Sequence, residues 1–242
     1  MDGSWEDPDV PTWWQREFTD GVDPEYTEQI IPIVVDALDG HRRILDVGTG
    51  EGQIARALQG RGSEVIGLDP ISAQVSTAAE RGGGPRYLQA GADAVPLRSG
   101  SVDGALACLV FEHIDAVDAA IAEVARVLRP GGRFVFLLNH PLLQTPGSGW
   151  IDDQIIEPPE QYWRIGPYLT EAATVEEVQK DVFIRFVHRP LSRYLNALIG
   201  AGLALTEMRE PAPPAGFLEA AVEYEDAATI PRLLVLVLTR AD

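Results

Sequence analysis

The sequence predicts an α/β protein built around a parallel β-sheet. Between residues 43 and 138, short apolar runs alternate with segments of helical periodicity, which is the pattern of consecutive βα units. The first apolar run leads directly into a glycine-rich turn, residues 48–52, which opens a helix. The chain has 242 residues, enough for one sizeable domain with a full hydrophobic core and too few for several independent domains.

Five strands and three helices are predicted within this alternation. The helix at residues 115–128 is the most regular, because its apolar residues from Val117 to Leu128 recur at steps of four, three and four and share one face. Asp115 is expected to cap its start, and Pro130 helps to end it. The other helices are expected at residues 53–58 and 72–81, and the strands at 44–47, 65–68, 86–88, 102–110 and 133–138.

The segments outside the alternation are predicted to cover the sheet or to extend it. Residues 25–38 read as a helix interrupted at Pro32, and with Trp13 and Trp14 they are expected to form an N-terminal helical cover. After the fifth strand the alternation breaks for about fifty residues, which is too long for an ordinary connection and indicates a functional insertion. The remaining elements are a β-like stretch at 181–188, a helix at 191–200, and strands at 203–208 and 233–238.

The charge balance and the cysteine count exclude several partners. Asp and Glu total 37 against 19 Lys and Arg, and the net charge of −18 repels a nucleic-acid backbone. No apolar run approaches the roughly 20 residues that span a membrane, and the acidic N-terminus does not resemble a signal peptide. Cys108 is the only cysteine, which excludes an intrachain disulfide and a cysteine-rich zinc site. A cytoplasmic protein is therefore predicted.

Lys180 is the only lysine, and its position excludes two classes of enzyme. A phosphate-binding loop requires Gly-Lys-Ser/Thr, whereas Gln179 precedes this lysine. A reductase pair of the Tyr-x-x-x-Lys type requires tyrosine at the position that Glu176 occupies. Neither chemistry is available to the chain.

The turn at residues 48–52 reads Gly-x-Gly-x-Gly and predicts close approach of the backbone to a ligand. A dinucleotide-binding turn would have its third glycine one position later, where this chain has Gln53. Asp46 and Glu51 flank the turn and would repel a pyrophosphate, whereas they would attract an ammonium group. Asp69 ends the second strand, where a carboxylate can bind both ribose hydroxyls. A nucleoside with a cationic tail satisfies all three acidic positions.

S-adenosylmethionine is such a ligand, and here the chain resembles the class I S-adenosylmethionine-dependent methyltransferase family, with a core of the methyltransferase type 11 kind. The resemblance extends from about residue 43 to residue 139 and rests on four motifs in order. The motifs are Leu45-Asp46-Val47-Gly48-Thr49-Gly50-Glu51-Gly52, Gly67-Leu68-Asp69-Pro70, Ala92-Asp93-Ala94-Val95-Pro96-Leu97 leading into Ser101-Val102-Asp103, and Glu123-Val124-Ala125-Arg126-Val127-Leu128-Arg129-Pro130-Gly131-Gly132.

The resemblance implies a fold and a set of cofactor contacts. The fold is Rossmann-like, a doubly wound seven-stranded sheet of order 3-2-1-4-5-7-6 with the seventh strand antiparallel. The glycines of the turn would lie beside the methionine moiety, Asp69 on the ribose, Asp93 near the adenine amino group, and Asp46 near the amino end. The implied cofactor is S-adenosylmethionine, with S-adenosylhomocysteine as its product. The implied cofactor-binding residues are Asp46, Gly48, Thr49, Gly50, Gly52, Asp69, Pro70, Ala92, Asp93 and Leu109.

Histidines are the candidate bases, because a hydroxyl, phenol or protonated amine must lose a proton when it is methylated. His140 directly follows the fifth strand, where ligands bind in parallel sheets, and is the leading candidate. His113 follows the fourth strand and is the second candidate, with packing under the next helix as its alternative role. The histidines show no His-x-x-x-His spacing, so no metal site is predicted.

Aromatic residues of the insertion are expected to form an apolar lid around an acceptor ring. The competing interpretation is that they only anchor a long insertion. Upstream, Trp13, Trp14 and Arg16 are candidates to close the cofactor pocket, with Arg16 paired to the methionine carboxylate. The predicted substrate-binding residues are Trp150, Tyr162, Trp163, Tyr168 and His188.

The predicted function is methyl transfer from S-adenosylmethionine to an oxygen or nitrogen atom of a small-molecule acceptor. A non-catalytic S-adenosylmethionine-binding regulatory or scaffold protein stays open as the alternative, and a nicotinamide-dependent oxidoreductase is disfavoured by the acidic turn. The predicted single domain comprises an N-terminal helical cover (1–40), a cofactor-binding core (41–139), a substrate-lid insertion (140–190) and a C-terminal helix with two strands (191–242). No oligomeric state is predicted.

Overall fold

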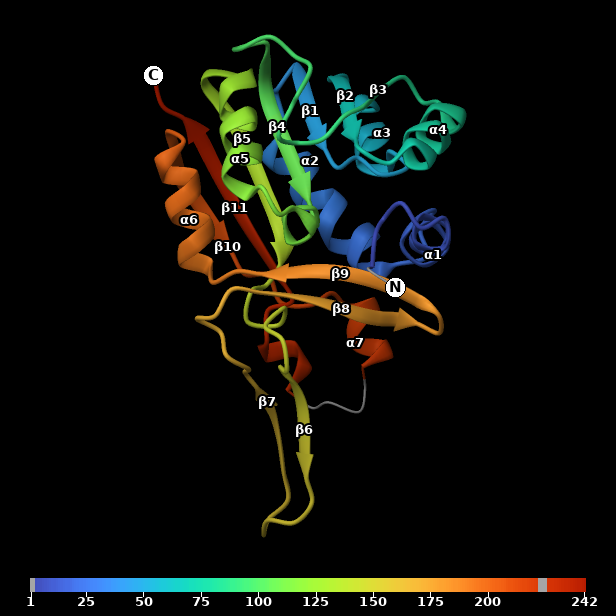
Figure 1. Ribbon diagram of the computed structural model, residues 1–242, viewed down its shortest axis with the longest axis vertical. Helices are drawn as coiled ribbons and strands as arrows, with labels where there is room; N and C mark the ends of the chain where they lie inside the picture. Colours follow the sequence, from blue (N-terminus) through green and yellow to red (C-terminus); the bar gives the residue numbers. More distant parts are fainter. Residues whose placement is uncertain (1–2, 222–225) are drawn as a thin grey trace.

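A computed structural model describes residues 3–221 and 226–242 of the chain (Figure 1). Within these residues the central element is a seven-stranded sheet in the order β10-β11-β5-β4-β1-β2-β3. The strands β1 to β5 are parallel, whereas β11 is antiparallel to both β5 and β10. The predicted order, with the last strand of the chain inserted antiparallel beside the fifth, is confirmed. The strands are β1 Arg43–Val47, β2 Glu64–Asp69, β3 Arg86–Gln89, β4 Val102–Cys108, β5 Leu128–Asn139, β10 Leu203–Arg209 and β11 Leu233–Arg240.

Helices cover both faces of the sheet, because the central strands present apolar side chains to both sides. On one face, Val124 and Leu198 of two helices join Phe136 of β5 in one buried cluster. On the other face, Val34 and Leu58 belong to a second buried cluster. The helices of the first face are α5 Val117–Val127 and α6 Leu191–Gly200, and those of the second are η1 Glu25–Ile30, α2 Ile31–Ala37 and α3 Gln53–Gln59.

The N-terminal cover changes its helical pitch next to Pro32. In the π-helix η1, the amide of Ile31 donates to the carbonyl of Tyr26, five residues earlier. Pro32 stands in the first turn of α2, directly after η1, and has no N–H to donate to the preceding helical turn, so the pitch changes beside it. The helix that the sequence predicted to be interrupted at Pro32 therefore continues through it.

Two further helices flank the carboxyl ends of the strands. α1 Asp9–Phe18 lies beyond the ends of β1 and β2, and α4 Ser72–Arg81 packs beside β2 and β3 (Figure 1). The shorter helical turns are η2 Phe111–His113, α7 Ala215–Ala220 and η3 Ala227–Thr229.

The start of α5 differs from the prediction. Its N-cap residue is Ala116, with no side-chain capping hydrogen bond. The carboxylate of Asp115 instead accepts two hydrogen bonds from the guanidinium of Arg185, at 2.8 and 3.1 Å. The capping prediction is wrong, because the paired guanidinium competes for both carboxylate oxygens.

The insertion after β5 contains two antiparallel hairpins with different positions. The hairpin of β8 Ala172–Gln179 and β9 Val182–His188 lies across the carboxyl end of the sheet, where β9 contacts η2 and α1 (Figure 1). Lys180 lies in its exposed turn, next to Asp181 with a φ of +66°. The hairpin of β6 Gly149–Asp153 and β7 Glu160–Arg164 projects away from the body.

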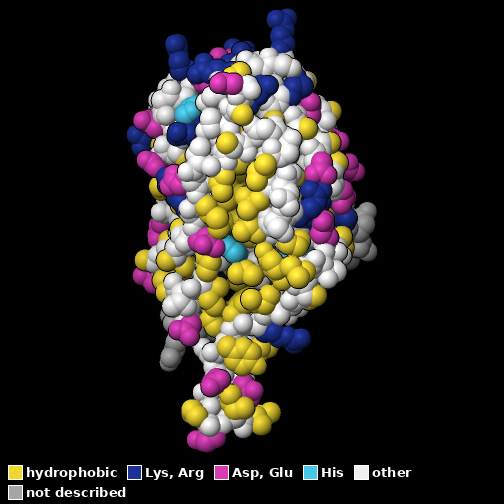
Figure 2. All heavy atoms as spheres, turned by 90° about the vertical axis from the view of Figure 1, so that its left-hand side faces the viewer, with side chains coloured by type: hydrophobic (Ala, Val, Ile, Leu, Met, Phe, Trp, Pro, Cys, Tyr) yellow, Lys and Arg dark blue, Asp and Glu magenta, His cyan; other side chains and the backbone are white. Residues whose placement is uncertain are grey.

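One face of the molecule carries a band of apolar side chains between charged margins (Figure 2). This is the face with α6, and the exposed apolar residues of α6 and of the edge strand β10 are Ile199, Leu205 and Met208. Among the helices that the structure describes, none is long and apolar enough to cross a membrane.

Candidate functional site

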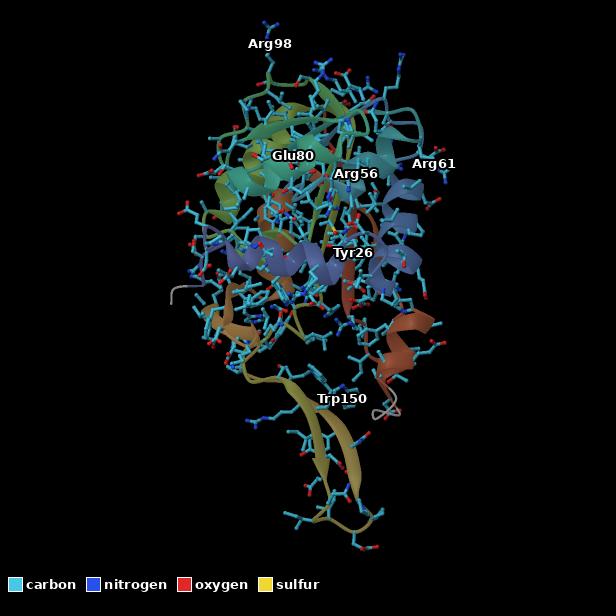
Figure 3. The ribbon with its side chains drawn as sticks, turned by 90° about the vertical axis from the view of Figure 1, so that its right-hand side faces the viewer. Tyr26, Arg56, Arg61, Glu80, Arg98 and Trp150 are labelled. Carbon is cyan, nitrogen blue, oxygen red and sulfur yellow. The ribbon has the colours of Figure 1, made fainter. Side chains whose placement is uncertain are left out.

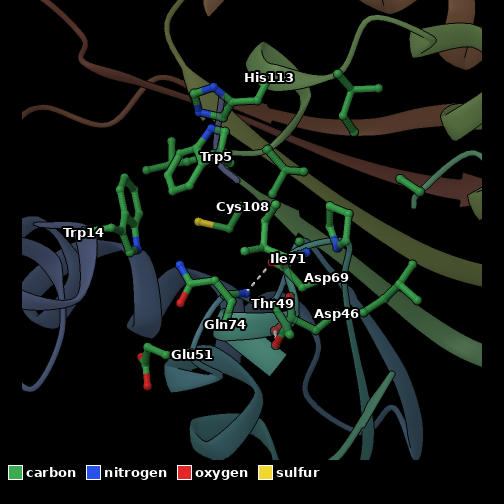
Figure 4. Close-up of a pocket in the computed structure, with 18 of the residues that line it drawn as sticks. Trp5, Trp14, Asp46, Thr49, Glu51, Asp69, Ile71, Gln74, Cys108 and His113 are labelled. Carbon is green, nitrogen blue, oxygen red and sulfur yellow. Dashed lines mark hydrogen bonds between the residues drawn. The ribbon is translucent and has the colours of Figure 1, made fainter. Parts of the chain in front are cut away.

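A cavity of about 350 Å³ lies at the carboxyl ends of β1, β2 and β4 (Figure 4). Residues of the glycine turn and of the strand ends form its floor, and aromatic residues of the N-terminal segment form its opposite wall. Its described lining contains acidic side chains but no lysine or arginine. The cavity therefore favours a cationic or neutral ligand over a phosphate.

The glycine turn brings bare backbone to the cavity. Gly48 has a φ of +68°, and a Cβ atom there would lie 2.3 Å from a methyl group of Val110. The amides of Gly48 and Thr49 donate to the carbonyl of Leu68, at 2.7 and 2.9 Å, which ties the turn to the end of β2. Gly50 also has a positive φ, of +55°. Only glycine adopts this sequence of conformations without strain, so the motif is required by the turn itself.

Asp46 is the last residue but one of β1 and lies on the cavity floor with an exposed fraction of 2%. The hydroxyl of Thr49 donates to its Oδ2 at 2.7 Å. Burial raises the pKa of Asp46 to about 7, and the neighbouring carboxylates of Asp69 and Glu51 act in the same direction. A bound cation would restore the ionised form, because opposite charge stabilises it.

Asp69 joins the second strand to the glycine turn. Its Oδ2 accepts the N–H of Gly50 at 2.9 Å and its Oδ1 accepts the N–H of Ile71 at 2.9 Å. Burial raises its pKa, although both backbone hydrogen bonds oppose the shift. Each oxygen keeps a further lone pair, so the carboxylate can still accept hydrogen bonds from a pair of hydroxyls in the cavity.

Aromatic rings form the wall opposite the glycine turn. Trp5, Trp14, Tyr26 and His113 all line the cavity. Figure 4 shows Trp5 and Trp14 on one side of the cavity, with the Cys108 thiol between them and the floor. These rings come from the N-terminal segment and from η2, which the fold brings together at the end of β4.

Comparison with known proteins assigns this arrangement to a family. A methyltransferase domain family matches residues 45–136. The structure is similar to an S-adenosylmethionine-dependent methyltransferase of Mesorhizobium loti, with a TM-score of 0.76 and 28% identity, over 91% of this chain and 99% of that chain. Residues 45–136 therefore match a methyltransferase domain, and the fold is that of class I S-adenosylmethionine-dependent methyltransferases. The predicted cofactor, S-adenosylmethionine, is thereby confirmed.

Two curated relatives match a smaller part of the chain. An uncharacterized methyltransferase of Mycobacterium bovis is 35% identical over 128 residues, which is 53% of this chain and 50% of that protein. A malonyl-[acyl-carrier protein] O-methyltransferase of Enterobacter lignolyticus is 35% identical over 94 residues, 39% of this chain and 38% of that protein. The chain thus spans half or less of the length of these curated relatives.

The structure places most of the predicted cofactor-binding residues in the methyltransferase cavity. Among them, Leu109 has a φ of +55°, a strained conformation for a leucine that its N–H bond to the carbonyl of Leu137 helps to hold. Strain of this kind is common next to ligand sites. The predicted residues that line the cavity are Asp46, Gly48, Thr49, Gly50, Asp69, Pro70, Ala92 and Leu109.

Gly52 and Asp93 are the two predicted cofactor residues that do not line the cavity. Gly52 has a φ of +85°, and a Cβ atom there would lie 2.3 Å from the hydroxyl of Tyr87. Packing against Tyr87 therefore requires glycine at position 52, at the start of α3. The side chain of Asp93 is exposed in the loop after β3. The cofactor contacts assigned to these two residues therefore stay predictions, with no place in the cavity lining.

The charge of Glu51 is not available to a ligand in the way that the sequence suggested. Its Oε2 accepts hydrogen bonds from Arg56 at 2.6 Å and from Arg81 at 2.7 Å. Two guanidinium groups outweigh one carboxylate, so the acidic character of the floor depends on Asp46 and Asp69.

The two candidate bases occupy different environments. His113 lines the cavity, and its Nδ1 lies 3.0 Å from the carbonyl oxygen of Arg185. His140 has an exposed fraction of 3% and lies outside the cavity lining. Its Nε2 lies 2.8 Å from Glu210, and its Nδ1 accepts the N–H of Leu142. The geometry reverses their predicted ranking, because both nitrogens of His140 already bind the protein.

The predicted substrate-binding residues do not reach the cavity. Trp150 and Trp163 pack edge to face on the projecting hairpin, with ring centroids 5.6 Å apart, and Figure 3 shows Trp150 far below Tyr26. The hydroxyl of Tyr168 accepts the N–H of Leu191. In this arrangement the aromatics pack within the insertion, which agrees with the competing interpretation, and the lid around an acceptor ring stays a prediction. Two more predicted substrate-binding residues also lie outside the cavity. Tyr162 is exposed on β7, and His188 is buried with its Nε2 at 2.7 Å from the carbonyl oxygen of Tyr168.

Of the two tryptophans predicted to close the pocket, Trp14 lines the cavity and Trp13 does not, whereas Trp5 and Tyr26 line it without having been predicted. Arg16, expected near the methionine carboxylate, instead pairs with Glu17 at 2.7 Å and with Gln179. Among the described residues, no group of three or more histidine, cysteine, aspartate or glutamate side chains is arranged to hold a metal ion.

Proposed function

We propose that this protein transfers a methyl group from S-adenosylmethionine to an oxygen or nitrogen atom of a small-molecule acceptor. The observation that carries the proposal is that one cavity joins an acidic, glycine-lined floor to an aromatic wall with a histidine. The floor suits the cofactor, and the wall suits a second, less polar molecule. Binding both in one cavity is what methyl transfer requires.

The residues of the floor would hold the cofactor. Bare backbone at Gly48 and Gly50 would allow close approach of its methionine part, Asp46 would attract its cationic end, and Asp69 would accept hydrogen bonds from its ribose. The bound cofactor supplies a methyl group on a sulfonium sulfur, which is already activated for transfer. The protein then has mainly to align the acceptor and to exclude water, which can lower a barrier by about 7–11 kcal/mol in favourable cases.

Several properties support a small acceptor. The acceptor would share a cavity of about 350 Å³ with the cofactor, which favours a small molecule, and the net charge of −18 opposes nucleic acid. Relatives named malonyl-[acyl-carrier protein] O-methyltransferases favour oxygen as the methylated atom. The described lining lacks lysine and arginine, however, so a carboxylate acceptor would have no cationic partner. A neutral acceptor in the cytoplasm agrees best with these features.

Calorimetric titration of the purified protein with S-adenosylmethionine, S-adenosylhomocysteine and NADH tests the cofactor part of the proposal. We expect the two adenosyl compounds to bind and NADH not to bind. Formation of S-adenosylhomocysteine in the presence of a panel of phenols, alcohols and amines tests turnover. Tight cofactor binding without turnover of any acceptor would favour the non-catalytic alternative, and binding of NADH alone would refute the proposal.

A further inference from the structure

The aromatic wall of the cavity is a continuous series of rings. Trp14 and Trp5 pack edge to face with centroids 5.6 Å apart, and Trp5 and His113 do so at 5.1 Å. On its other side, His113 packs against Phe186 at 4.9 Å. Figure 4 shows Trp5 between His113 and the cavity floor, with Trp14 beside it. A ligand on this wall would meet ring faces and ring edges.

The wall is positioned by two contacts to β9. The carbonyl of Gly3 accepts the N–H of Arg185 at 3.0 Å, which holds the segment that carries Trp5. Gly3 has a φ of +70°, and a Cβ atom there would lie 2.7 Å from the nitrogen of Arg185, so this approach requires glycine. The carbonyl of the same Arg185 lies 3.0 Å from Nδ1 of His113. One residue of β9 therefore fixes both Trp5 and His113.

The contact to Arg185 determines which nitrogen of His113 is free. A carbonyl oxygen can only accept, so Nδ1 of His113 carries the proton and Nε2 keeps a lone pair. No hydrogen bond within the described part of the chain uses Nε2. Burial between the neighbouring rings lowers the pKa of His113 to about 4, so the imidazole is neutral at pH 7.

Apart from Glu6, which lines the cavity next to Trp5 in the sequence, the described residues of this wall are also uncharged. Tyr26 and Cys108 line the cavity beside Trp14, and burial raises the pKa of both well above the ordinary values. Both groups are therefore protonated near neutral pH. An anionic acceptor would lose its hydration here without meeting an opposite charge, which is unfavourable.

We propose that the acceptor is an uncharged, planar aromatic or heteroaromatic molecule with a hydroxyl group, which packs against Trp5 and Trp14 and donates a hydrogen bond to Nε2 of His113. This inference rests on the proposed function and adds the chemical class of the acceptor. Edge-to-face and offset packing favour a flat ring over a saturated one of equal size. The lone pair of Nε2 selects a ring that carries an O–H donor over one that does not.

In the same geometry, Nε2 of His113 can accept the proton that the hydroxyl group loses during methylation. As the hydroxyl oxygen forms its bond to the methyl carbon, the bond from that carbon to sulfur breaks and its electron pair stays on sulfur. The oxygen becomes positively charged during this step, so its proton becomes strongly acidic and passes to Nε2 of His113. The imidazolium then releases the proton to water, because its pKa of about 4 makes it a weak base at pH 7. The net products are a methyl ether, S-adenosylhomocysteine and one proton.

Four probes bound to the complex of the protein with S-adenosylhomocysteine test the class of acceptor. The probes are 2-naphthol, its methyl ether, the saturated alcohol 2-decalol and the anion 2-naphthoate. We expect 2-naphthol to bind at least about tenfold more tightly than each of the others. Equal affinities, or preference for 2-decalol or 2-naphthoate, would overturn the inference. Because the cofactor product is bound first, its own titration shows separately whether the proposed function fails.

Variants then test the residues. His113→Asn should abolish the preference for 2-naphthol over its methyl ether. With an acceptor that the unmodified protein is able to methylate, the variant should also have a kcat that is lower by roughly 10²–10⁴-fold. Trp5→Leu should weaken all ring probes while Trp5→Phe keeps most of the affinity. Trp163→Phe, on the projecting hairpin, is the matched tryptophan control and should change nothing. Unchanged probe preference in His113→Asn, with S-adenosylhomocysteine binding intact, would refute the role of His113.

Discussion

Nε2 of His140 lies 2.8 Å from Oε1 of Glu210, a residue seventy positions later in the chain. The other ring nitrogen accepts the N–H of Leu142, so the tautomer with the proton on Nε2 satisfies both contacts. This pair connects the end of β5 to the segment that follows β10. The imidazole that the sequence favoured as a base therefore acts as a bridge between two segments.

The first prediction is that His140→Asn destabilises the protein without removing its chemistry. Asparagine cannot make both contacts of the imidazole, so we expect a loss of about 1–3 kcal/mol in the free energy of unfolding. The affinity for S-adenosylmethionine and the kcat for an identified acceptor should stay within about twofold, since the residue lies outside the cavity lining. Chemical denaturation and steady-state kinetics measure the two quantities. A large loss of kcat with normal stability would restore His140 as a base.

The second prediction separates two aspartates of the family motifs. Asp69→Ala should weaken S-adenosylmethionine binding by at least about a hundredfold, because it removes the carboxylate that faces the cavity and also holds Gly50. Asp93→Ala should leave the affinity nearly unchanged, because that side chain is exposed outside the lining. Calorimetric titration of both variants with S-adenosylmethionine measures the two affinities under the same conditions. Equal losses in the two variants would show that Asp93 moves to the ligand on binding.

The third prediction is a pH dependence of cofactor affinity. The pKa of Asp46 is about 7, so its carboxyl is mostly neutral at pH 6 and mostly ionised at pH 8. The affinity for the cationic cofactor should therefore rise with pH over this range, by up to about tenfold for one ionisation. Asp46→Asn, which can still accept from Thr49, should flatten the profile. 5′-Methylthioadenosine, which lacks the ammonium and sulfonium groups, should show no such rise with the unmodified protein.

The fourth prediction concerns Glu112, which precedes His113. Its Oε1 accepts hydrogen bonds from the amide and Nδ2 of Asn139, while its Oε2 is buried without a partner in the part of the chain that the structure describes. Burial raises its pKa to about 7. The folded state thus holds this proton more tightly than the unfolded state, so the carboxyl lowers stability as pH rises from about 4.5 to above 7.

Glu112→Gln should remove this pH-dependent loss. We compare the unfolding free energy of the variant with that of the unmodified protein at each pH. This difference should shift in favour of the variant by up to about 3 kcal/mol between pH 5 and pH 8.5. Urea unfolding at both pH values measures the difference. The same relative stability at pH 5 and pH 8.5 would contradict the raised pKa.

The fifth prediction is that the projecting hairpin is dispensable for the reaction. Gly149 and Arg164 are paired residues of β6 and β7, so an Asn-Gly turn can replace residues 150–163 between them. Cofactor affinity and kcat/KM should stay within about twofold, since no predicted aromatic on this hairpin reaches the cavity. A tenfold loss of kcat/KM with unchanged cofactor affinity would return Trp150 and Trp163 to the acceptor site.

The core of the fold could be predicted because its signals are local. The strand that ends at Val47 and the glycine turn after it follow each other directly in the sequence, and the turn geometry requires those glycines. Asp69 was recognisable for the same reason, since a polar residue that ends a buried parallel strand points to the ligand edge of the sheet. The antiparallel last strand came from the family resemblance, which periodicity alone does not supply.

The acceptor side could not be predicted because it depends on long-range contacts. Trp5 reaches the cavity only through the bond between Gly3 and Arg185, which joins the first residues to the insertion. Nothing near Trp5 in the sequence signals that bond. His140 and His113 both follow core strands, so position along the chain could not rank them. Two distant partners contribute to the ranking: Glu210 lies 70 residues from His140, and Arg185 lies 72 residues from His113.

The turn between β8 and β9 gives this protein a built-in attachment point for a spectroscopic label. Lys180 is the only side-chain amine of the chain, and it is exposed at the tip of the hairpin whose second strand carries Arg185. Apart from the α-amino group, an amine-reactive fluorophore has this single target. Its anisotropy would report the motion of the strand that holds both Trp5 and His113, without any engineered residue.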